Sequence, residues 1–127
     1  MEYIGKINRK IYHSITDVIV TDEVVLSDTQ IRHIQDHHPN DYEQYKQFLI
    51  QIVETPDYVI EANRPNSALL LKEFVIAELR FKLVLRLQTP NDPKEFKNSV
   101  ITFMRINEKE WSRLIRNKKV LYRRENY

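Results

Sequence analysis

The sequence predicts an α+β fold in which N-terminal helices pack on a C-terminal antiparallel sheet. Two patterns indicate this class. Apolar residues recur at helical spacing before Pro56, and the period shortens to two residues after it. Residues 77–89 then show the clearest strand pattern of the chain, with an apolar side chain at every second position from Leu79 to Leu87. We therefore expect helices in the first half and strands in the second.

Composition fits a single folded domain over residues 1–127. Apolar residues make up 42% of the chain and charged residues 30%, with one glycine, which argues against a disordered chain. The lack of cysteine excludes a disulfide scaffold and fits a reducing compartment. No apolar run approaches the roughly 18 residues of a membrane span, and the N-terminus lacks the apolar region of a signal peptide. We expect a cytoplasmic protein without a membrane partner, and the oligomeric state stays open.

The first half of the chain is expected to contain short β segments and two helices. Residues 3–12 alternate apolar and polar side chains, which suggests an opening strand. Residues 17–20, together with residues 24–26, form a second β segment that leads into the first helix. A second helix is expected over residues 40–53, with a polar cap at its start and core residues at helical spacing.

The second half is expected to form the sheet. The predicted strands are residues 56–62, 68–76, 77–89 and 99–106, separated by a turn at residues 63–67 and a hairpin loop at residues 89–97. Asn107 and Glu110 have the spacing of a cap for a last helix, whose apolar stripe includes Trp111. Residues 119–122 add an edge strand or a docked tail.

The C-terminal end of the chain is basic. From Lys109 onward seven basic residues stand against two acidic ones, a local net charge of +5, whereas the whole chain carries +2. This asymmetry favours an anionic partner, and nucleic acid ahead of a membrane, because no strongly apolar helix face accompanies it. The alternative is an ordinary solvated surface.

Three of the four histidines lie in the first predicted helix. Ser27 and Gln30 have the spacing of a capping box and start this helix, and Pro39 ends it one or two residues earlier. His33 and His37 are four residues apart and share a helix face. A histidine can both take and give a proton near neutral pH, because its unperturbed pKa is about 6.5. The pair is therefore a candidate acid–base set.

Two other interpretations of these histidines remain open. They can be polar residues at a helix end, where a positive charge is favoured by the helix dipole. His33 and His37 also have the spacing of two helical zinc ligands, although the glutamate of the HExxH pattern is missing and no cysteine is present to complete a site. The isolated His13 is expected to be a surface residue.

Four short motifs occur along the chain in a consistent order. They are H-I-x-x-H-H-P at residues 33–39, P-D-Y-V at residues 56–59, L-K-E-F around Lys72 and S-V-I-T-F at residues 99–103. In this order they resemble the phage-associated nucleases of the BECR fold, the broad group that unites barnase, EndoU, colicin and RelE-like ribonucleases. The resemblance implies a barnase/RelE-like architecture for this domain.

The resemblance also implies RNA cleavage without a metal or another cofactor, by histidines with cationic and hydroxyl side chains on one sheet face. The catalytic residues that it implies are His33, His38, Lys72 and Thr102. The implied substrate-binding residues are His37, Arg80, Lys82, Arg86, Ser99 and Arg105. The family spacing favours His38 as the partner of His33, whereas helical geometry places His37 beside His33.

In the expected reaction, one histidine takes the proton of the ribose 2′-hydroxyl and another protonates the leaving 5′-oxygen, which leaves a 2′,3′-cyclic phosphate. Expected partners are RNA and, in a toxin-like role, a neutralising protein. One alternative is a non-catalytic RNA-binding domain that stacks bases on the tyrosines and phenylalanines of the sheet. The other is a phage-encoded protein-interaction module.

Overall fold

Seven strands form one sheet in the described part of the chain, which is residues 1–125 of a computed structural model. The strands are β1 (Glu2–Lys6), β2 (Glu23–Leu26), β3 (Tyr58–Glu61), β4 (Ser67–Phe74), β5 (Leu79–Arg86), β6 (Asn98–Ile106) and β7 (Val120–Arg123). The helical segments are α1 (Arg9–Tyr12), α2 (Asp28–His37), α3 (Asp41–Tyr45), the 3-10 turn η1 (Lys46–Phe48), α4 (Leu49–Glu54) and α5 (Glu108–Asn117). The domain predicted over residues 1–127 extends two residues beyond this part.

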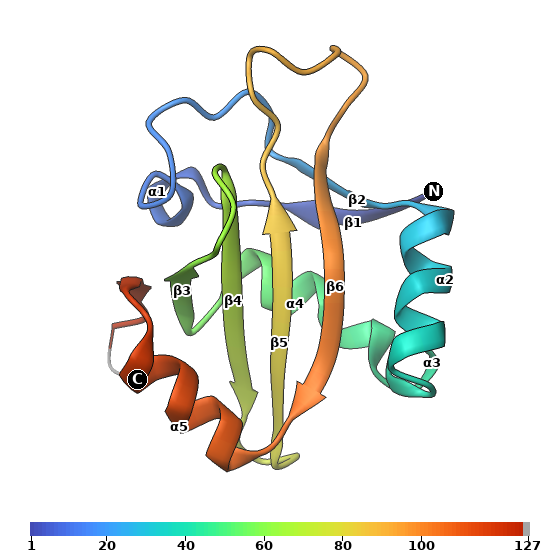
Figure 1. The fold of residues 1–127 in the computed structure, drawn as a ribbon, viewed down its shortest axis with the longest axis vertical. Coiled ribbons are helices and arrows are strands. Elements are labelled where there is room, and N and C mark those ends of the chain that lie inside the picture. The colour runs from blue at the N-terminus through green and yellow to red at the C-terminus, as the bar shows by residue number, and fades with distance from the viewer. Residues whose placement is uncertain (126–127) are drawn as a thin grey trace.

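The strand order in the sheet is β1-β2-β6-β5-β4-β3-β7 (Figure 1). Every neighbouring pair is antiparallel except β2 and β6, which run parallel. The three longest strands, β4, β5 and β6, form the centre of the sheet. This topology confirms the predicted α+β class with a mostly antiparallel sheet.

The N-terminal segment differs from the prediction. The strand predicted over residues 3–12 ends at Lys6, because the side-chain oxygen of Asn8 accepts a hydrogen bond from the N–H of Lys10 at 3.0 Å and caps α1. Residues 17–20, predicted as β structure, lie in the loop that precedes β2. Local capping therefore overrides the alternating pattern here.

The helix predicted from Ser27 is α2, and its cap is confirmed, since Ser27 Oγ accepts from the backbone N–H three residues on at 3.2 Å. The helix predicted over residues 40–53 is instead divided into α3, η1 and α4. The break lies at Tyr45, whose φ of −122° leaves the helical range. It allows the rings of Tyr45 and Phe48 both to pack on Phe81 of β5, at centroid distances of 5.2 and 5.5 Å.

The C-terminal elements follow the prediction. The side-chain oxygen of Asn107 accepts from the N–H of Glu110 at 2.8 Å and starts α5. Strand β7 pairs with β3 at the edge of the sheet, so the edge strand and not the docked tail is the correct alternative for this segment.

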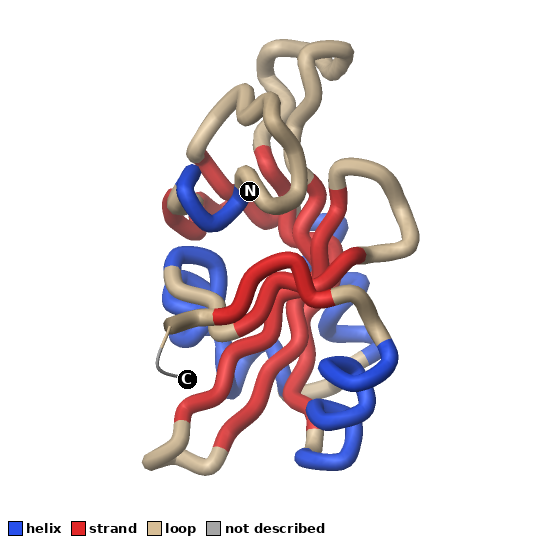
Figure 2. The backbone as a smooth tube through the Cα atoms, turned by 90° about the vertical axis from the view of Figure 1, so that its left-hand side faces the viewer, coloured by secondary structure: helices blue, strands red, loops and turns tan. Residues whose placement is uncertain are grey.

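Helices lie on both faces of the sheet (Figures 1 and 2). On one side, here called the core face, α1 to α4 and the sheet share the main core, which includes Phe81, Phe103 and Ile34. On the other side, the front face, α5 packs Trp111 and Leu114 against β3 and β4. Among residues 1–125, no helix has the length and apolar content that a membrane crossing requires.

We expect that Ile34→Ala lowers the free energy of unfolding by about 2–5 kcal/mol, because Ile34 of α2 is fully buried in the main core and the smaller side chain leaves a cavity. Urea denaturation followed by circular dichroism measures the change. Ile76→Ala is the matched control: Ile76 is fully exposed in the turn after β4, so its loss is expected to stay within about 0.5 kcal/mol. Equal losses in the two variants contradict the docking of α2 through Ile34.

Candidate active site

Helix α2 contains His33 and His37, and His38 is its C-cap. The helix runs alongside the exposed edge of β6. At its start, Ser27 and Gln30 line a hollow of about 340 Å³ together with Ser99 of β6. Just beyond its end, the Asp41 carboxylate accepts a hydrogen bond from the backbone N–H of Arg105 at 3.1 Å. Helix α2 therefore lies beside the part of β6 between Ser99 and Arg105.

His33 and His37 form a ring pair on the exposed side of α2. Their ring centroids are 4.1 Å apart, and His37 Nδ1 lies 2.9 Å from the backbone oxygen of His33. A carbonyl oxygen only accepts hydrogen bonds, so Nδ1 of His37 carries the hydrogen and the neutral ring keeps its lone pair on Nε2. Helical spacing places both rings next to the stripe of Gln30, which lines the hollow beside β6.

His38 occupies a different position from the other two histidines. It is the C-cap of α2, with φ −134° and ψ 70°, so its side chain leaves the helix outside the regular spacing. The structure therefore brings His37, and not His38, into ring contact with His33. Within residues 1–125 no group of three His, Cys, Asp or Glu side chains could hold a metal ion, so the zinc interpretation of His33 and His37 finds no third ligand there.

The register of the sheet decides which of the predicted residues share a face. Directly opposite residues of antiparallel strands point to the same face, and side chains alternate along each strand. Val84 of β5 lies opposite Thr102 of β6, and Arg86 lies opposite Ser99. The predicted residues on the front face are Arg80, Lys82, Arg86, Ser99 and Thr102.

Each predicted cation of the front face is paired with a carboxylate. The pairs are Arg80 with Glu73 at 2.9 Å, Lys82 with Glu110 at 3.6 Å and Arg86 with Asp92 at 3.0 Å. Arg86 is the most exposed of the three side chains, at 35%, and its guanidinium lies 4.4 Å from the centre of the Phe96 ring. A hydrogen bond from the Thr89 N–H, and then Arg86, lower the pKa of Asp92, so this pair is ionic at neutral pH.

Two predicted residues, Lys72 and Arg105, lie on the core face instead. Both are in register with Phe81, which is three positions from Val84 on β5 and therefore points to the opposite side. The Arg105 side chain donates to the hydroxyl of Tyr45 at 3.1 Å on that side. The expected convergence of Lys72 and Arg105 with the hydroxyl groups on one face is not met, because the sheet separates them.

Lys72 has partners that account for its burial. Its Nζ donates to the backbone oxygen of Thr55 at 2.6 Å and lies 3.6 Å from Asp57, which is fully buried. Asp57 also accepts from the N–H of Glu73 at 2.8 Å and lies 2.8 Å from Arg124 Nε. Burial lowers the pKa of Lys72, and the Asp57 carboxylate opposes that shift. The cluster joins β3, β4 and the segment after β7.

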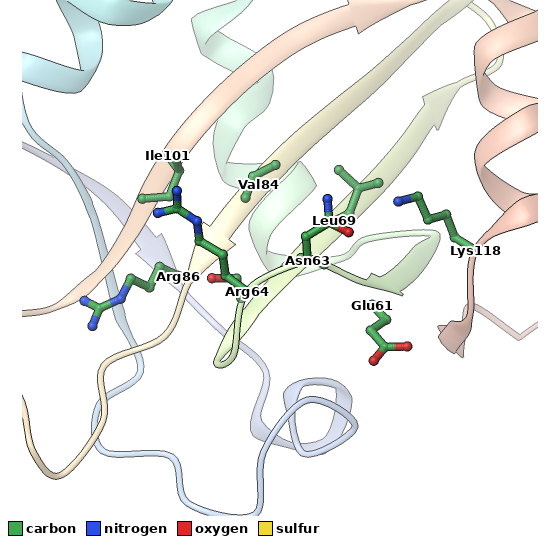
Figure 3. Close-up of a pocket in the computed structure, with 10 residues that line it drawn as sticks. Glu61, Asn63, Arg64, Leu69, Val84, Arg86, Ile101 and Lys118 are labelled. Atoms are coloured by element: carbon green, nitrogen blue, oxygen red, sulfur yellow. The ribbon is translucent and has the colours of Figure 1, made fainter.

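A second hollow on the front face contains residues that the sequence analysis did not single out. It has a volume of about 370 Å³, and it shares Arg86 and Ile101 with the hollow beside α2. Its further charged residues are Glu61, Arg64 and Lys118 (Figure 3). Arg64 stands in a turn pattern and carried no functional signal in the sequence, whereas Lys118 belongs to the basic C-terminal stretch that favoured an anionic partner.

Comparison with known proteins indicates the family to which the chain belongs. The model of the PBECR2 family, described as phage-Barnase-EndoU-ColicinE5/D-RelE like nuclease2, matches residues 2–123. The chain belongs to this nuclease family. The matched range runs from β1 to β7 and includes α2 and every residue that lines the two front-face hollows except Met1. No curated protein and no solved structure matched the chain. Membership in PBECR2 implies a nucleic acid substrate.

We expect that Lys72→Met leaves the nuclease activity per folded molecule unchanged, because the ammonium group lies on the core face, away from Thr102. The free energy of unfolding falls by about 1–3 kcal/mol, since the Thr55 oxygen and Asp57 each lose a donor. A nuclease assay at matched folded fraction and a urea titration measure the two effects. A large loss of activity in fully folded protein contradicts the placement of Lys72 outside the site.

Proposed function

We propose that this PBECR2 nuclease is a metal-independent endoribonuclease that cleaves RNA by attack of the ribose 2′-hydroxyl and leaves a 2′,3′-cyclic phosphate. The observation that carries this proposal is the His33–His37 ring pair, at 4.1 Å, on the helix that contacts β6, the strand that carries Thr102. Two imidazoles on α2, together with the hydroxyl and guanidinium groups of the front face, are the kinds of group that this reaction needs.

The reaction has two proton transfers. A base removes the proton of the 2′-hydroxyl, whose oxygen then bonds to the adjacent phosphorus, and an acid gives a proton to the 5′-oxygen as its bond to phosphorus breaks. We assign the base to His37, because its Nδ1–H is engaged with the His33 oxygen and Nε2 is left to accept a proton. His33 is assigned to the acid. His38, which the family spacing favours, is the alternative partner of His33.

The negative charge that develops on the phosphate requires donors and cations. We assign hydrogen-bond donation to Thr102, which shares the front face with Arg86, whereas the Ser99 hydroxyl donates to the Lys97 backbone oxygen at 2.9 Å. Arg86 is the cation best placed for this role, because it lines both front-face hollows and is about one third exposed. Arg80 and Lys82 are each paired with a carboxylate. We assign to them a contribution to the electrostatic potential around the site.

The non-catalytic RNA-binding alternative loses the central part of its expected stacking surface, while Tyr3 of the edge strand β1 is 57% exposed. Phe81 and Phe103 of the sheet are fully buried on the core face, and Tyr58 is only 8% exposed. For a toxin-like ribonuclease that acts in the cytoplasm, we also propose a protein partner that neutralises it. The front face, with its paired and unpaired cations, is the surface that such a partner would have to cover.

We expect that His33→Ala and His37→Ala each lower the rate of RNA cleavage in EDTA by about 10²–10⁴-fold, because each removes one proton transfer. Cleavage of a mixed RNA pool measures the rate, and mass spectrometry of the 3′ ends identifies the cyclic phosphate. His13→Ala is the control, since the His13 side chain is exposed and its Nδ1 lies 3.3 Å from the Thr16 backbone oxygen. His38→Ala separates the two candidate partners of His33. Undiminished cleavage by His33→Ala removes the mechanism.

We expect that Thr102→Val lowers the cleavage rate by about 10²-fold at unchanged stability, because it removes a donor to the phosphate while keeping the shape of the side chain. Thr102→Ser should restore most of the rate, since it keeps the hydroxyl. The control is Thr29→Val in the exposed first turn of α2, which leaves the rate unchanged. A Thr102→Val protein as active as the wild type shows that the hydroxyl has no part in cleavage.

A further inference from the structure

The second front-face hollow has an apolar floor and a charged rim. Leu69 of β4, Val84 of β5 and Ile101 of β6 line its floor, and they lie side by side across three neighbouring strands. The walls come from the turn between β3 and β4, which contributes Arg64, and from the end of α5, which contributes Lys118 (Figure 3). An open patch of apolar side chains at the centre of a sheet face is the kind of surface that binds a flat apolar ring.

The rim of the hollow is positively charged, and some of its cations have no ion-pair partner within residues 1–125. In Figure 3 the side chains of Arg64 and Lys118 extend over the strands from opposite sides of the hollow. Neither side chain forms an ion pair within residues 1–125, in contrast to the cations of β5. Glu61 is the one carboxylate among the residues that line the hollow. Three cations, with Arg86, therefore surround an apolar floor, which is complementary to a base joined to phosphates.

We propose that this hollow binds one unstacked nucleotide of a single-stranded RNA, with its base on Leu69, Val84 and Ile101 and its flanking phosphates on Arg64 and Lys118. The inference rests on the proposed function for its substrate, and it adds the strandedness and the subsite. The volume of about 370 Å³ lies in the range of about 300–1,000 Å³ that small-ligand sites have.

Single-stranded RNA fits this surface better than a duplex. A base in a duplex has both faces covered by its neighbours, so it cannot lie on an apolar floor unless it is extruded at a cost. The hollow also adjoins the one beside α2, because Arg86 and Ile101 line both. A strand that passes over Arg86 can thus place one base in the hollow and the next phosphate toward the ring pair of α2.

The binding test uses the wild-type chain and a fluorescent single-stranded 2′-O-methyl oligonucleotide of about eight nucleotides, read by fluorescence anisotropy. The methyl group blocks the 2′-oxygen, so binding is measured without the proposed cleavage. The same strand annealed to its complement, and a strand with abasic positions, are compared. The protein variants are Arg64→Gln with Lys118→Gln and, as a matched control, Arg116→Gln, an exposed cation of α5 outside the hollow.

We expect the single strand to bind more tightly than the duplex, and abasic positions to weaken binding on the order of tenfold. The double variant should lower the slope of log Kd against log salt by about 0.7 for each removed cation, whereas Arg116→Gln leaves it unchanged. The double variant should also reduce the penalty for abasic positions, because base and phosphates occupy one hollow.

Equal affinity for the abasic strand, duplex binding as tight as that of the single strand, or an unchanged salt slope in the double variant overturns the inference. An unchanged salt slope in the double variant is also the result expected if the hollow binds a protein instead of RNA. Base-dependent binding together with intact RNA in the cleavage assay overturns the proposed function and leaves the subsite standing. Cleavage of RNA together with binding that does not depend on the base overturns the subsite and leaves the proposed function standing.

Discussion

The alternation of side chains across β5 is the constraint on which the rest of the structure depends. Phe81, Leu83 and Leu85 are fully buried on the core face, and the residues between them are forced to the front face. A shift of one residue in the register would bury the cations and expose the core, so the register is strongly fixed. This single alternation places Thr102 and Arg86 on one side of the sheet and Lys72 on the other.

Charge pairing on the front face divides its cations into two kinds. The strand cations have carboxylate partners, which limits the attraction that they exert on a phosphate. Arg64 and Lys118 come from a turn and a helix end and form no ion pair within the described chain. The front-face cations that no carboxylate neutralises within residues 1–125 therefore lie at the rim of the second hollow, and Arg86 lines both that hollow and the one beside α2.

Helix α2 covers an edge of the sheet and also positions the histidines. Strand β2 pairs with only Asn98 and Ser99 of the nine residues of β6. Helix α2 with the following segment lies along the rest of that edge, where Asp41 satisfies the N–H of Arg105. The buried Ile34 holds the helix against the core, so the His33–His37 pair on its exposed side is fixed beside the sheet. The stability of the fold and the position of the proposed acid–base pair thus depend on the same contact.

The sequence by itself determined the fold class, the caps at Ser27 and Asn107, the central strands and the histidine helix, because each depends on residues close together in the chain. It also indicated the family through the order of short motifs. Only the tertiary structure decided that the core face holds Lys72 and that Arg64 and Lys118 line the same hollow over β4, β5 and β6. Strand register and long-range packing decide whether two residues far apart in the chain share a face of the sheet. Neither can be predicted from the local sequence.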